Sequence, residues 1–570
     1  MKKNIFLLLK LLSKSEKKNL IIFSFFTLIL VFVESLSIGL IVPIISVIFD
    51  QNNEINIIIS NYYNLDPQSN QLIKFLVFIF IMIYFFKSFY ILFYNWYLMK
   101  FSNRVQVRLS SVLLKNYLSL NFTSFFKRNS AELIRNIMAE CAKIRNILRN
   151  IIFLVSEIFV SLGIIVLITL VNIEAAISAV LVVIISSLIY LILFRKKVKK
   201  LGDEQVELSK MILKSIMQKI SSYKLINIIN KKYYFLNEFK NDLIKTTNNN
   251  LKVSLINILP RIWIEVFGIF SLGIFILYLT SSNYEPEKII TTIGLLAFAS
   301  LRIFPSISRI TLSLQSLKFV TATLEKVSAD INLDKFSEIN SVNLRLINFE
   351  EELQFKNLNF SFNKTGDKAN IFNNVNFSIK KNESIFVKGE SGSGKSTLGN
   401  IISGLIRPDS GQIIIDKNKY DFVRDNIRIN VGFVHQETYL LDDTIKNNIA
   451  MGEEKNNINL KKLKDVIEKS QLEKFVKDLP LGINTIVGEK GSQISVGQAQ
   501  RIGIARTLYH DPDLIIFDEA TSSLDEENAN EIIDMVNNLK KTKGIFFISH
   551  DIKYEKKFDK VLELKNSQIL

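Results

Sequence analysis

Long apolar stretches alternate with short polar segments through the first part of the chain. Six stretches each contain at least the roughly 20 residues that a helix needs to cross a lipid bilayer. They cover Leu20–Phe49, Leu72–Phe101, Ile151–Val171, Ile173–Phe194, Leu259–Leu279 and Ile289–Leu317. The first is longer than the apolar region of a signal peptide and no small-residue cleavage site follows it. The pattern therefore predicts an all-α transmembrane domain of six helices over residues 1–325.

Two connections between these stretches, residues 102–149 and 195–258, are long and rich in Lys and Arg. They have helical periodicity and few Gly or Pro, so we expect the flanking helices to extend beyond the membrane. The connections on the opposite side lack this basic excess. By the positive-inside rule, both long connections and both chain ends are expected in the cytoplasm.

From about residue 350, short apolar runs alternate with amphipathic segments, which is typical of an α/β domain with a largely parallel sheet. We expect this domain over residues 350–570 and a polar linker over 326–349. The net charge of the chain is +17, whereas residues 336–570 have a net charge of −2. The basic excess therefore lies in the apolar half. This distribution indicates membrane loops and no nucleic-acid partner. One Cys and three His exclude a disulfide framework and leave few ligands for a Cys/His metal centre.

A glycine-rich segment follows the strand-like run Ser384–Val387 and precedes the helix-like run Leu398–Leu405. In that context, backbone N–H groups and a helix N-terminus can wrap a phosphate. Lys395 would neutralise phosphate oxygens, and Ser396 would bind Mg²⁺. The expected nucleotide contacts in this loop are Gly389, Glu390, Ser391, Gly392, Ser393, Gly394, Lys395, Ser396 and Thr397.

Two buried-strand patterns later in the chain end in polar residues. The run Leu514–Phe517 ends in Asp518 and Glu519, and Gly544–Ser549 ends in His550. Asp518 at such a strand end can hold Mg²⁺, and Glu519 can polarise the attacking water. His550 can contact the γ-phosphate, with a satisfied structural histidine as the alternative. His435 and His510 are interpreted as incidental.

These motifs and their spacing resemble the ATP-binding cassette (ABC) ATPase. The resemblance implies that Gln436 links Mg²⁺ and the lytic water to the membrane domain, and that Phe362 stacks on adenine unless it is an ordinary strand residue. Val496 replaces a glycine of the family's signature motif, although similar signatures occur in active members. The remaining contacts implied for ATP are the signature residues Ser495, Gly497 and Gln498 and the D-loop residue Asp525.

Six spans ahead of one cassette resemble a half-size ABC exporter, in which ATP lies between two subunits. The chain has one set of motifs, so we expect it to pair, most economically as a homodimer. The resemblance also implies two short cytoplasmic helices that transmit motion. Their candidates are Asn121–Phe126 and Lys224–Asn230, with plain loop as the alternative.

Four cations in the apolar stretches are candidates for a substrate site. Charged residues in a membrane are costly and often functional. Three of them fall at inner-leaflet depth and the fourth, Arg309, two turns below Arg302, and together they could receive a phosphate or pyrophosphate. The alternatives are that they reach lipid phosphates or pair locally, as Arg261 could with Glu265. The four are Lys87, Arg261, Arg302 and Arg309.

Three membrane segments resemble the lipid-linked oligosaccharide flippases of the PglK type: Val33–Pro43, Pro260–Glu265 and Leu301–Arg309. A short external helix of that family has a weak match at Glu54–Asn61. The resemblance implies a multi-pass protein of the bacterial inner membrane, with ATP and Mg²⁺ as cofactors, that moves a lipid-linked oligosaccharide or other anionic glycolipid outward. The alternatives are export of lipid A, peptides or drugs, and a nontransporting or regulatory ABC ATPase, which the intact catalytic residues disfavour.

Overall fold

The chain forms two compact units in a computed structural model, which describes residues 2–49, 70–281, 286–319, 321–332, 345–362, 370–421, 425, 427–488 and 491–569. The first unit, here the transmembrane unit, comprises residues 1–117 and 130–333. The second, the ATPase unit, comprises residues 118–129 and 334–570. The match to an external helix at Glu54–Asn61 lies outside the described residues.

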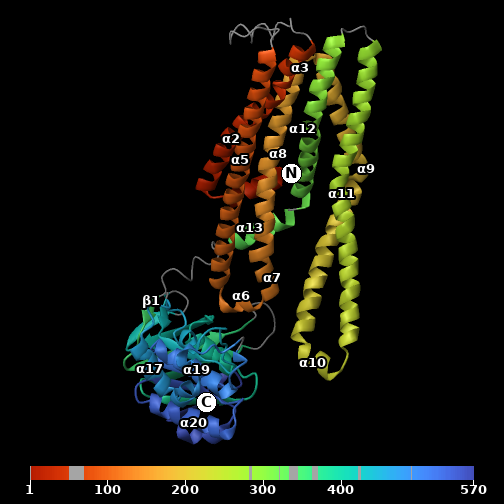
Figure 1. The fold of residues 1–570 in the computed structure, drawn as a ribbon. Coiled ribbons are helices and arrows are strands. Elements are labelled where there is room, and N and C mark those ends of the chain that lie inside the picture. Colours follow the sequence, from red (N-terminus) through yellow and green to blue (C-terminus); the bar gives the residue numbers. More distant parts are fainter. Residues whose placement is uncertain are drawn as a thin grey trace. The chain divides into compact units, whose positions relative to one another are not determined.

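The transmembrane unit is helical throughout its described part (Figure 1). Among the described residues, six helical segments are long and apolar enough to cross a membrane, as the sequence predicts. The helices are α1 (Lys2–Leu11), α2 (Lys14–Gly39), α3 (Ile41–Phe49), α5 (Asn70–Leu118), α7 (Ser130–Arg135), the π-helix η1 (Asn136–Glu140), α8 (Cys141–Val171), α9 (Ile173–Ser221), α10 (Tyr223–Ile228), α11 (Lys232–Ser281), α12 (Pro286–Phe319) and α13 (Thr321–Ile331).

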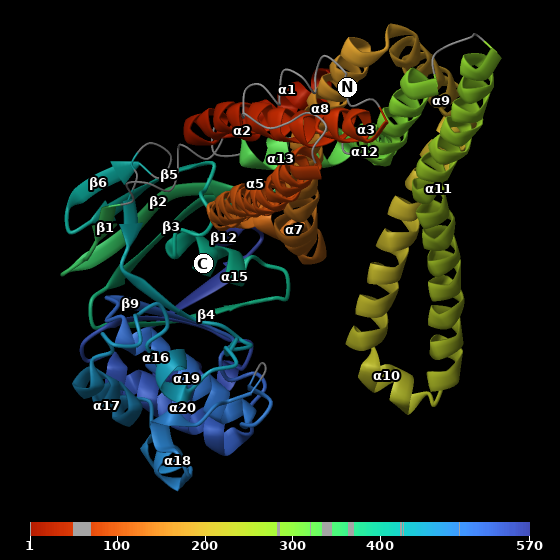
Figure 2. The ribbon, with the colours of Figure 1, turned by 45° about the horizontal axis from the view of Figure 1, so that its top comes forward.

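The predicted extension of helices beyond the apolar stretches is confirmed. Helix α5 continues to Leu118, and α9 and α11 pair along most of their length, with α10 at their turn (Figures 1 and 2). The second short helix is therefore present close to its predicted position. The first predicted span divides at Leu40 into α2 and α3.

Buried polar side chains fasten α13 to the rest of the transmembrane unit. The Tyr117 hydroxyl donates to Asp330 Oδ2 at 2.6 Å, and the Asn136 amide donates to the same oxygen at 3.1 Å. One π-helical turn away, Glu140 Oε2 accepts a 2.6 Å hydrogen bond from Thr323. Buried hydrogen-bonded groups hold a specific geometry, because breaking one bond leaves a desolvated partner. Helix α13 thus occupies the first residues of the range expected to be linker.

The ATPase unit has the expected α/β architecture. Its main sheet has the strand order β12-β11-β4-β10-β9-β8, parallel except for β12. A second, antiparallel sheet has the order β3-β2-β5-β6, and β1 pairs with β7. The strands are β1 (Arg345–Ile347), β2 (Glu352–Phe360), β3 (Phe372–Lys380), β4 (Ser384–Gly389), β5 (Ser410–Ile415), β6 (Asn418–Asp421), β7 (Ile427–Ile429), β8 (Val431–Val434), β9 (Leu514–Asp518), β10 (Gly544–Ile548), β11 (Lys560–Lys565) and β12 (Gln568–Ile569).

Helices cover the main sheet of the ATPase unit and enclose two apolar clusters. Strands β9 and β10 are almost wholly apolar and buried, which a parallel strand covered on both faces requires. The helices are α15 (Lys395–Ile402), α16 (Ile445–Ile449), α17 (Leu460–Lys469), α18 (Glu473–Asp478), α19 (Val496–Tyr509) and α20 (Glu526–Leu539), with 3-10 turns η2 (Gly482–Asn484) and η4 (Ile552–Lys557).

Helix α6 (Phe122–Phe126) is the first of the two predicted short helices, and Asn121 caps its N-terminus. It belongs to the ATPase unit, although the chain on either side belongs to the transmembrane unit. Phe122 packs against the apolar cluster that contains Phe360 and Phe372. An isolated helix of this length is unstable in water, so tertiary packing must hold it.

Candidate nucleotide site and transmembrane charge network

The phosphate loop connects β4 to α15, as the motif predicts. Gly392 and Gly394 have φ of 83° and 101°, a conformation that glycine adopts without strain. A Cβ on Gly394 would lie 2.8 Å from Ile371, so a side chain there would also collide. The Lys395 ammonium donates to the carbonyls of Gly389 and Glu390, at 2.9 Å each. The loop therefore holds its cation against its own backbone at the start of a helix.

Burial dominates the electrostatics of Lys395. It lowers the pKa of the ammonium, and the nearby carboxylates of Glu519 and Asp518 oppose that shift only in part. The loop's positive charge is thus incompletely compensated within the chain. Such a group gains from an anion that approaches it, and helix N-termini favour the same charge.

Asp518 lies at the end of β9, beside the phosphate loop. Its Oδ1 accepts a 3.0 Å hydrogen bond from the Ser396 hydroxyl. Burial raises the pKa of Asp518, and the bond from Ser396 opposes the rise. One carboxylate and one hydroxyl oxygen at this distance suit Mg²⁺, which prefers oxygen ligands together with phosphate oxygens. Ser396 and Asp518 therefore fit the predicted metal role.

Glu519 and His550 follow the adjacent strands β9 and β10, and the sheet order brings them together. His550 Nε2 lies 2.9 Å from Glu519 Oε1. Glu519 has a φ of 52°, in the left-handed region that non-glycine residues seldom adopt. Backbone strain of this kind often occurs at functional sites, and here it accompanies the predicted catalytic base.

Gln436 lies between β8 and α16, and its amide donates to Ser522 Oγ at 3.1 Å. No hydrogen bond from Gln436 to Ser396 or Asp518 is recorded among the described residues. The structure therefore brings Ser396 and Asp518 together directly and leaves Gln436 bonded to Ser522, close in sequence to Glu519.

Gln500 is a further site residue that the sequence analysis missed. It is 2% exposed; its side-chain oxygen accepts a 2.8 Å bond from Thr438, and its amide donates to the His435 carbonyl at 2.9 Å. These two bonds bracket Gln436 and tie its loop to α19. The signal was present, since Gln500 lies two residues after Gln498 on the helix that the signature opens. Burial lowers the pKa of His435, with Asp518 nearby as an opposing influence.

The signature residues form the N-terminus of α19. Ser495 caps it: its hydroxyl accepts from the Gln498 N–H while the Gln498 side chain accepts from the Ser495 N–H. Val496 is 57% exposed, so the residue that departs from the family signature points to the surface. Gly497 has room for a Cβ in ordinary contact with Asn528. No hydrogen bond or ion pair joins these residues to the phosphate loop in the part of the chain described.

Phe362 and Asp525 are also predicted to contact the nucleotide. Neither has a hydrogen bond or ion pair with Lys395 among the described residues. Phe362 is 52% exposed and makes an edge-to-face contact with Phe360, with ring centroids 5.0 Å apart. It thus presents much of its ring to solvent, as a stacking residue would. Asp525 caps α20 by accepting a 2.9 Å bond from the Asn528 N–H.

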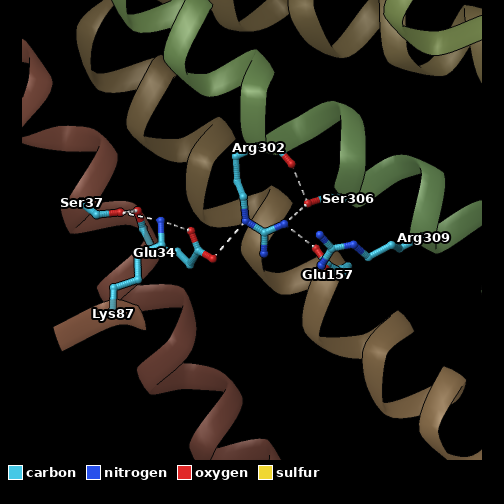
Figure 3. Close-up of polar contacts among 7 residues, drawn as sticks. All are labelled: Glu34, Ser37, Lys87, Glu157, Arg302, Ser306 and Arg309. Atoms are coloured by element: carbon cyan, nitrogen blue, oxygen red, sulfur yellow. Dashed lines mark hydrogen bonds and ion pairs between the residues drawn. The ribbon is translucent and has the colours of Figure 1, made fainter. Parts of the chain in front are cut away.

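Inside the transmembrane unit, the predicted cations meet two carboxylates (Figure 3). Glu34 Oε1 accepts a hydrogen bond from Arg302 Nε at 3.0 Å. Its other oxygen forms an ion pair with Lys87 at 2.8 Å, without a hydrogen bond. Glu157 accepts hydrogen bonds from Arg302 at 2.9 Å and from Arg309 at 2.6 Å. We call these five residues, which come from α2, α5, α8 and α12, the transmembrane charge network: Glu34, Lys87, Glu157, Arg302 and Arg309.

Helical spacing explains why Glu34 faces the interior. It lies four residues from both Leu30 and Ile38, which belong to the apolar cluster of this unit. Residues four apart share one helix face, so the carboxylate must enter the same interface. Its side chain is 2% exposed, and that of Glu157 is 4% exposed.

Arg261 does not join the transmembrane charge network among the described residues. Its Nε donates to Glu265 at 2.8 Å within α11, and its side chain is 64% exposed. The local pairing considered for this residue is therefore what the structure contains. Of the four predicted cations, Lys87, Arg302 and Arg309 are brought together, and Arg261 is separate from them.

The fold and the two sites define a P-loop ATPase fused to a helical membrane domain, and comparison with known proteins agrees. Residues 20–301 match the ABC transporter transmembrane region, and residues 372–522 match the ABC transporter family. The chain belongs to the ABC transporter family. It is an integral multi-pass membrane protein and an ATP-driven exporter with an ATP-hydrolysing domain.

The chain is similar to proteins whose names state different cargoes or none. An export ATP-binding/permease protein of Rickettsia bellii is 28% identical over 476 residues, 81% of this chain and 80% of that protein. The ATP-dependent lipid A-core flippase of Desulfotalea psychrophila is 26% identical over 379 residues, 66% of this chain and 64% of the flippase. The leukotoxin translocation protein LktB of Mannheimia glucosida is 35% identical over 228 residues, which are 40% of this chain but 32% of LktB.

A solved structure supports the same fold over nearly the whole chain. A bacterial Atm1-family ABC exporter with ATP bound superposes with a TM-score of 0.74 and 16% identity, covering 98% of this chain and 95% of the exporter. At this identity the likeness concerns the fold alone.

Proposed function

We propose that the protein uses ATP to move an anionic lipid or glycolipid, such as a lipid-linked oligosaccharide, from the inner to the outer leaflet of a bacterial inner membrane. The observation that carries this proposal is the transmembrane charge network. Charged side chains at membrane depth are costly. The network nevertheless joins residues of four helices and contains three cations and two carboxylates. The basic connections on α5, α9 and α11 support a cytoplasmic ATPase unit.

The proposed ATPase mechanism follows from the geometry of the nucleotide site. Lys395 and the N–H groups of the loop bind the β- and γ-phosphates, and Ser396 and Asp518 hold Mg²⁺, which neutralises phosphate charge when bound. Glu519 accepts a proton from the attacking water. His550, 2.9 Å from Glu519, orients that carboxylate and contacts the γ-phosphate.

We further propose that two copies of the chain complete each ATP site, with Ser495 and Gly497 of one opposite Lys395 of the other. Mixing a Ser495→Arg chain with a Lys395→Ala chain tests this proposal. Each mutant homodimer should lose ATP hydrolysis, whereas a heterodimer keeps one site free of both changes. Normal hydrolysis by either purified homodimer would contradict composite sites.

The direct test of transport is flipping of a labelled lipid-linked oligosaccharide in proteoliposomes with ATP. The Glu519→Gln protein serves as the control for ATP-independent leakage. A second candidate function is export of another amphipathic cargo, because the carboxylates Glu34 and Glu157 neutralise most of the cationic charge. ATP-dependent export of lipid A without flipping of the oligosaccharide carrier would favour it.

A further inference from the structure

Buried polar residues lie close in sequence to each place where the chain leaves or re-enters the transmembrane unit. The first segment of that unit ends at Tyr117, the second begins at Ser130, and the unit ends at residue 333. Tyr117 thus stands at the first crossing, Asn136 follows the second within two turns, and Asp330 precedes the third within one turn. We call Tyr117, Asn136 and Asp330 the crossing cluster.

The three side chains of the crossing cluster form a closed triangle of hydrogen bonds. The Tyr117 hydroxyl donates to Asp330 Oδ2 at 2.6 Å. The Asn136 amide donates to the same carboxylate oxygen and to the Tyr117 hydroxyl oxygen, at 3.1 Å each. All three residues are buried, and Asp330 is the most exposed of them at 6%. Each crossing is therefore bonded directly to the other two.

Neighbouring hydrogen bonds strengthen the same attachment. The Asn116 amide donates to the last two carbonyls of α13, at 3.1 and 2.9 Å, and so ties the end of α13 to the end of α5. The Thr323 hydroxyl, near the start of α13, donates to Glu140 at 2.6 Å. Glu140 and Asn136 both belong to the π-helix η1. Such turns occur frequently at functional sites, and this one supplies two of the bonds that hold α13.

The polar chemistry of the crossing cluster favours a role beyond cohesion. Apolar side chains could hold these helices together without the cost of burying polar groups. In the part of the chain that the structure describes, two buried acceptors here, Asn116 Oδ1 and Asn136 Oδ1, also have no hydrogen-bond partner. What buried hydrogen bonds add is one defined geometry, because a shift that breaks one bond leaves a desolvated group. A displacement of one crossing should therefore be passed to the other two.

We propose that the crossing cluster makes the three crossings move as one body and so couples ATP-driven changes in the ATPase unit to the transmembrane helices. Tyr117 belongs to α5, Asn136 leads into α8, and Asp330 lies in α13, which follows α12. These three are positioning residues, which act through the geometry of the helices and not by contact with ATP. The inference goes beyond the proposed function, because it applies to an ATP-driven exporter of any cargo.

The test measures how far an ATP-driven change reaches along α8 in the full chain, reconstituted in lipid. Leu170 is 83% exposed near the far end of α8, about 50 Å along the helix from Asn136. Leu170→Cys in a Cys141→Ala background gives one site for a spin label, because Cys141 is the single cysteine of the chain. The electron paramagnetic resonance spectrum is recorded without nucleotide and with ATP and vanadate, and ATP hydrolysis is measured on the same samples without vanadate.

Tyr117→Phe removes one hydroxyl and keeps the ring. It should lower the ratio of the ATP-induced to the resting spectral component by about tenfold, the scale of one hydrogen bond to a charged group. ATP hydrolysis should persist, because the nucleotide site is unchanged. The matched control is Tyr94→Phe, which removes an equally buried hydroxyl from the same helix, one that shares a 3.3 Å hydrogen bond with Thr27. This control should keep the wild-type spectral response even if its Tm falls.

Asp330→Asn provides a second variant, which keeps the shape of the side chain and removes its charge. It should also lose spectral response, and combining it with Tyr117→Phe should cost less than the sum of the two losses, because both act on one hydrogen bond. Should Tyr117→Phe not fold, Asp330→Asn alone carries the comparison with Tyr94→Phe.

A purely structural role for the crossing cluster predicts a different result. The Tm would fall in Tyr117→Phe, Asp330→Asn and Tyr94→Phe alike, and the folded protein would keep its response to ATP. That result, additive losses in the double variant, or a wild type whose label does not respond to ATP would overturn the inference. None of these measurements needs a cargo, so the flipping assay tests the proposed function separately.

Discussion

The nucleotide site and the transmembrane charge network both bury charge but satisfy it in different ways. Lys395 donates to two backbone carbonyls, and burial still lowers its pKa despite the nearby carboxylates. In the network, each cation pairs directly with a carboxylate. The nucleotide site therefore keeps a positive charge available for an anionic ligand. In the network, ion pairs within the network neutralise most of the charge. Their responses to the loss of a carboxylate should therefore differ in kind.

The largest effect is expected where a carboxylate serves chemistry. Glu519→Gln should lower the ATP hydrolysis rate by about 10²–10⁴, the usual contribution of general-base catalysis. ATP binding should persist, because the phosphate contacts come from the loop. Steady-state hydrolysis and nucleotide-binding assays check this result, with exposed Glu473→Gln as the control. Near-wild-type hydrolysis would remove Glu519 from the role of base.

Next in size is the removal of a carboxylate that serves structure. Glu34→Gln leaves Lys87 and Arg302 without that charge, and breaking a buried pair typically costs about 3–5 kcal/mol. Thermal unfolding should show a Tm several degrees lower. Glu265→Gln, at an exposed pair, should cost less than about 1 kcal/mol. Equal Tm values for the two variants would contradict the difference drawn between closed and exposed pairs.

A smaller effect is expected for Gln500→Leu, which replaces the polar amide by an apolar side chain of similar size. The variant leaves the Thr438 hydroxyl and the His435 carbonyl without this partner, at about 1–3 kcal/mol. Because Gln500 positions the Gln436 loop and touches no phosphate, kcat should fall while the KM for ATP changes little. Exposed Gln493→Leu is the control. A rise in KM with unchanged kcat would indicate a binding role instead.

The smallest effect concerns the pH dependence of stability. Burial raises the pKa of Asp518, so the folded state binds its proton more tightly than the unfolded state does. This group therefore costs stability as pH rises through the raised pKa, and the cost disappears below the ordinary carboxyl range. Asp518→Asn should slightly raise the Tm of the nucleotide-free protein at neutral pH and not at acidic pH. A lower Tm at neutral pH would contradict the direction of the shift.

The nucleotide site could be predicted because it is local in sequence. Nine consecutive residues form the loop, and Asp518, Glu519 and His550 end strands that a parallel sheet places side by side. Geometry of this kind follows from backbone hydrogen bonding. The single-chain contacts do not bring Ser495 to Lys395 among the described residues, so that pairing stays a prediction.

The transmembrane charge network could be predicted only in part. Charged residues within apolar stretches drew attention to Lys87 and Arg302, and the same reasoning applied to Glu34 and Glu157 would have revealed their partners. Which acid meets which cation depends on how four helices pack, and no local pattern records that. Helix α13 did leave a signal, because buried Leu324 and Val327 are three residues apart.

The placement of α6 has a consequence for anyone who would exchange parts between exporters. Residues 118–129 belong to the ATPase unit, yet the chain before and after them belongs to the transmembrane unit. The backbone thus passes between the units at three places and not at the linker alone. A chimera joined only near residue 334 would give a foreign ATPase unit the α6 of this chain, with Phe122 against an apolar surface it did not evolve with. A working graft should therefore transfer residues 118–129 together with 334–570.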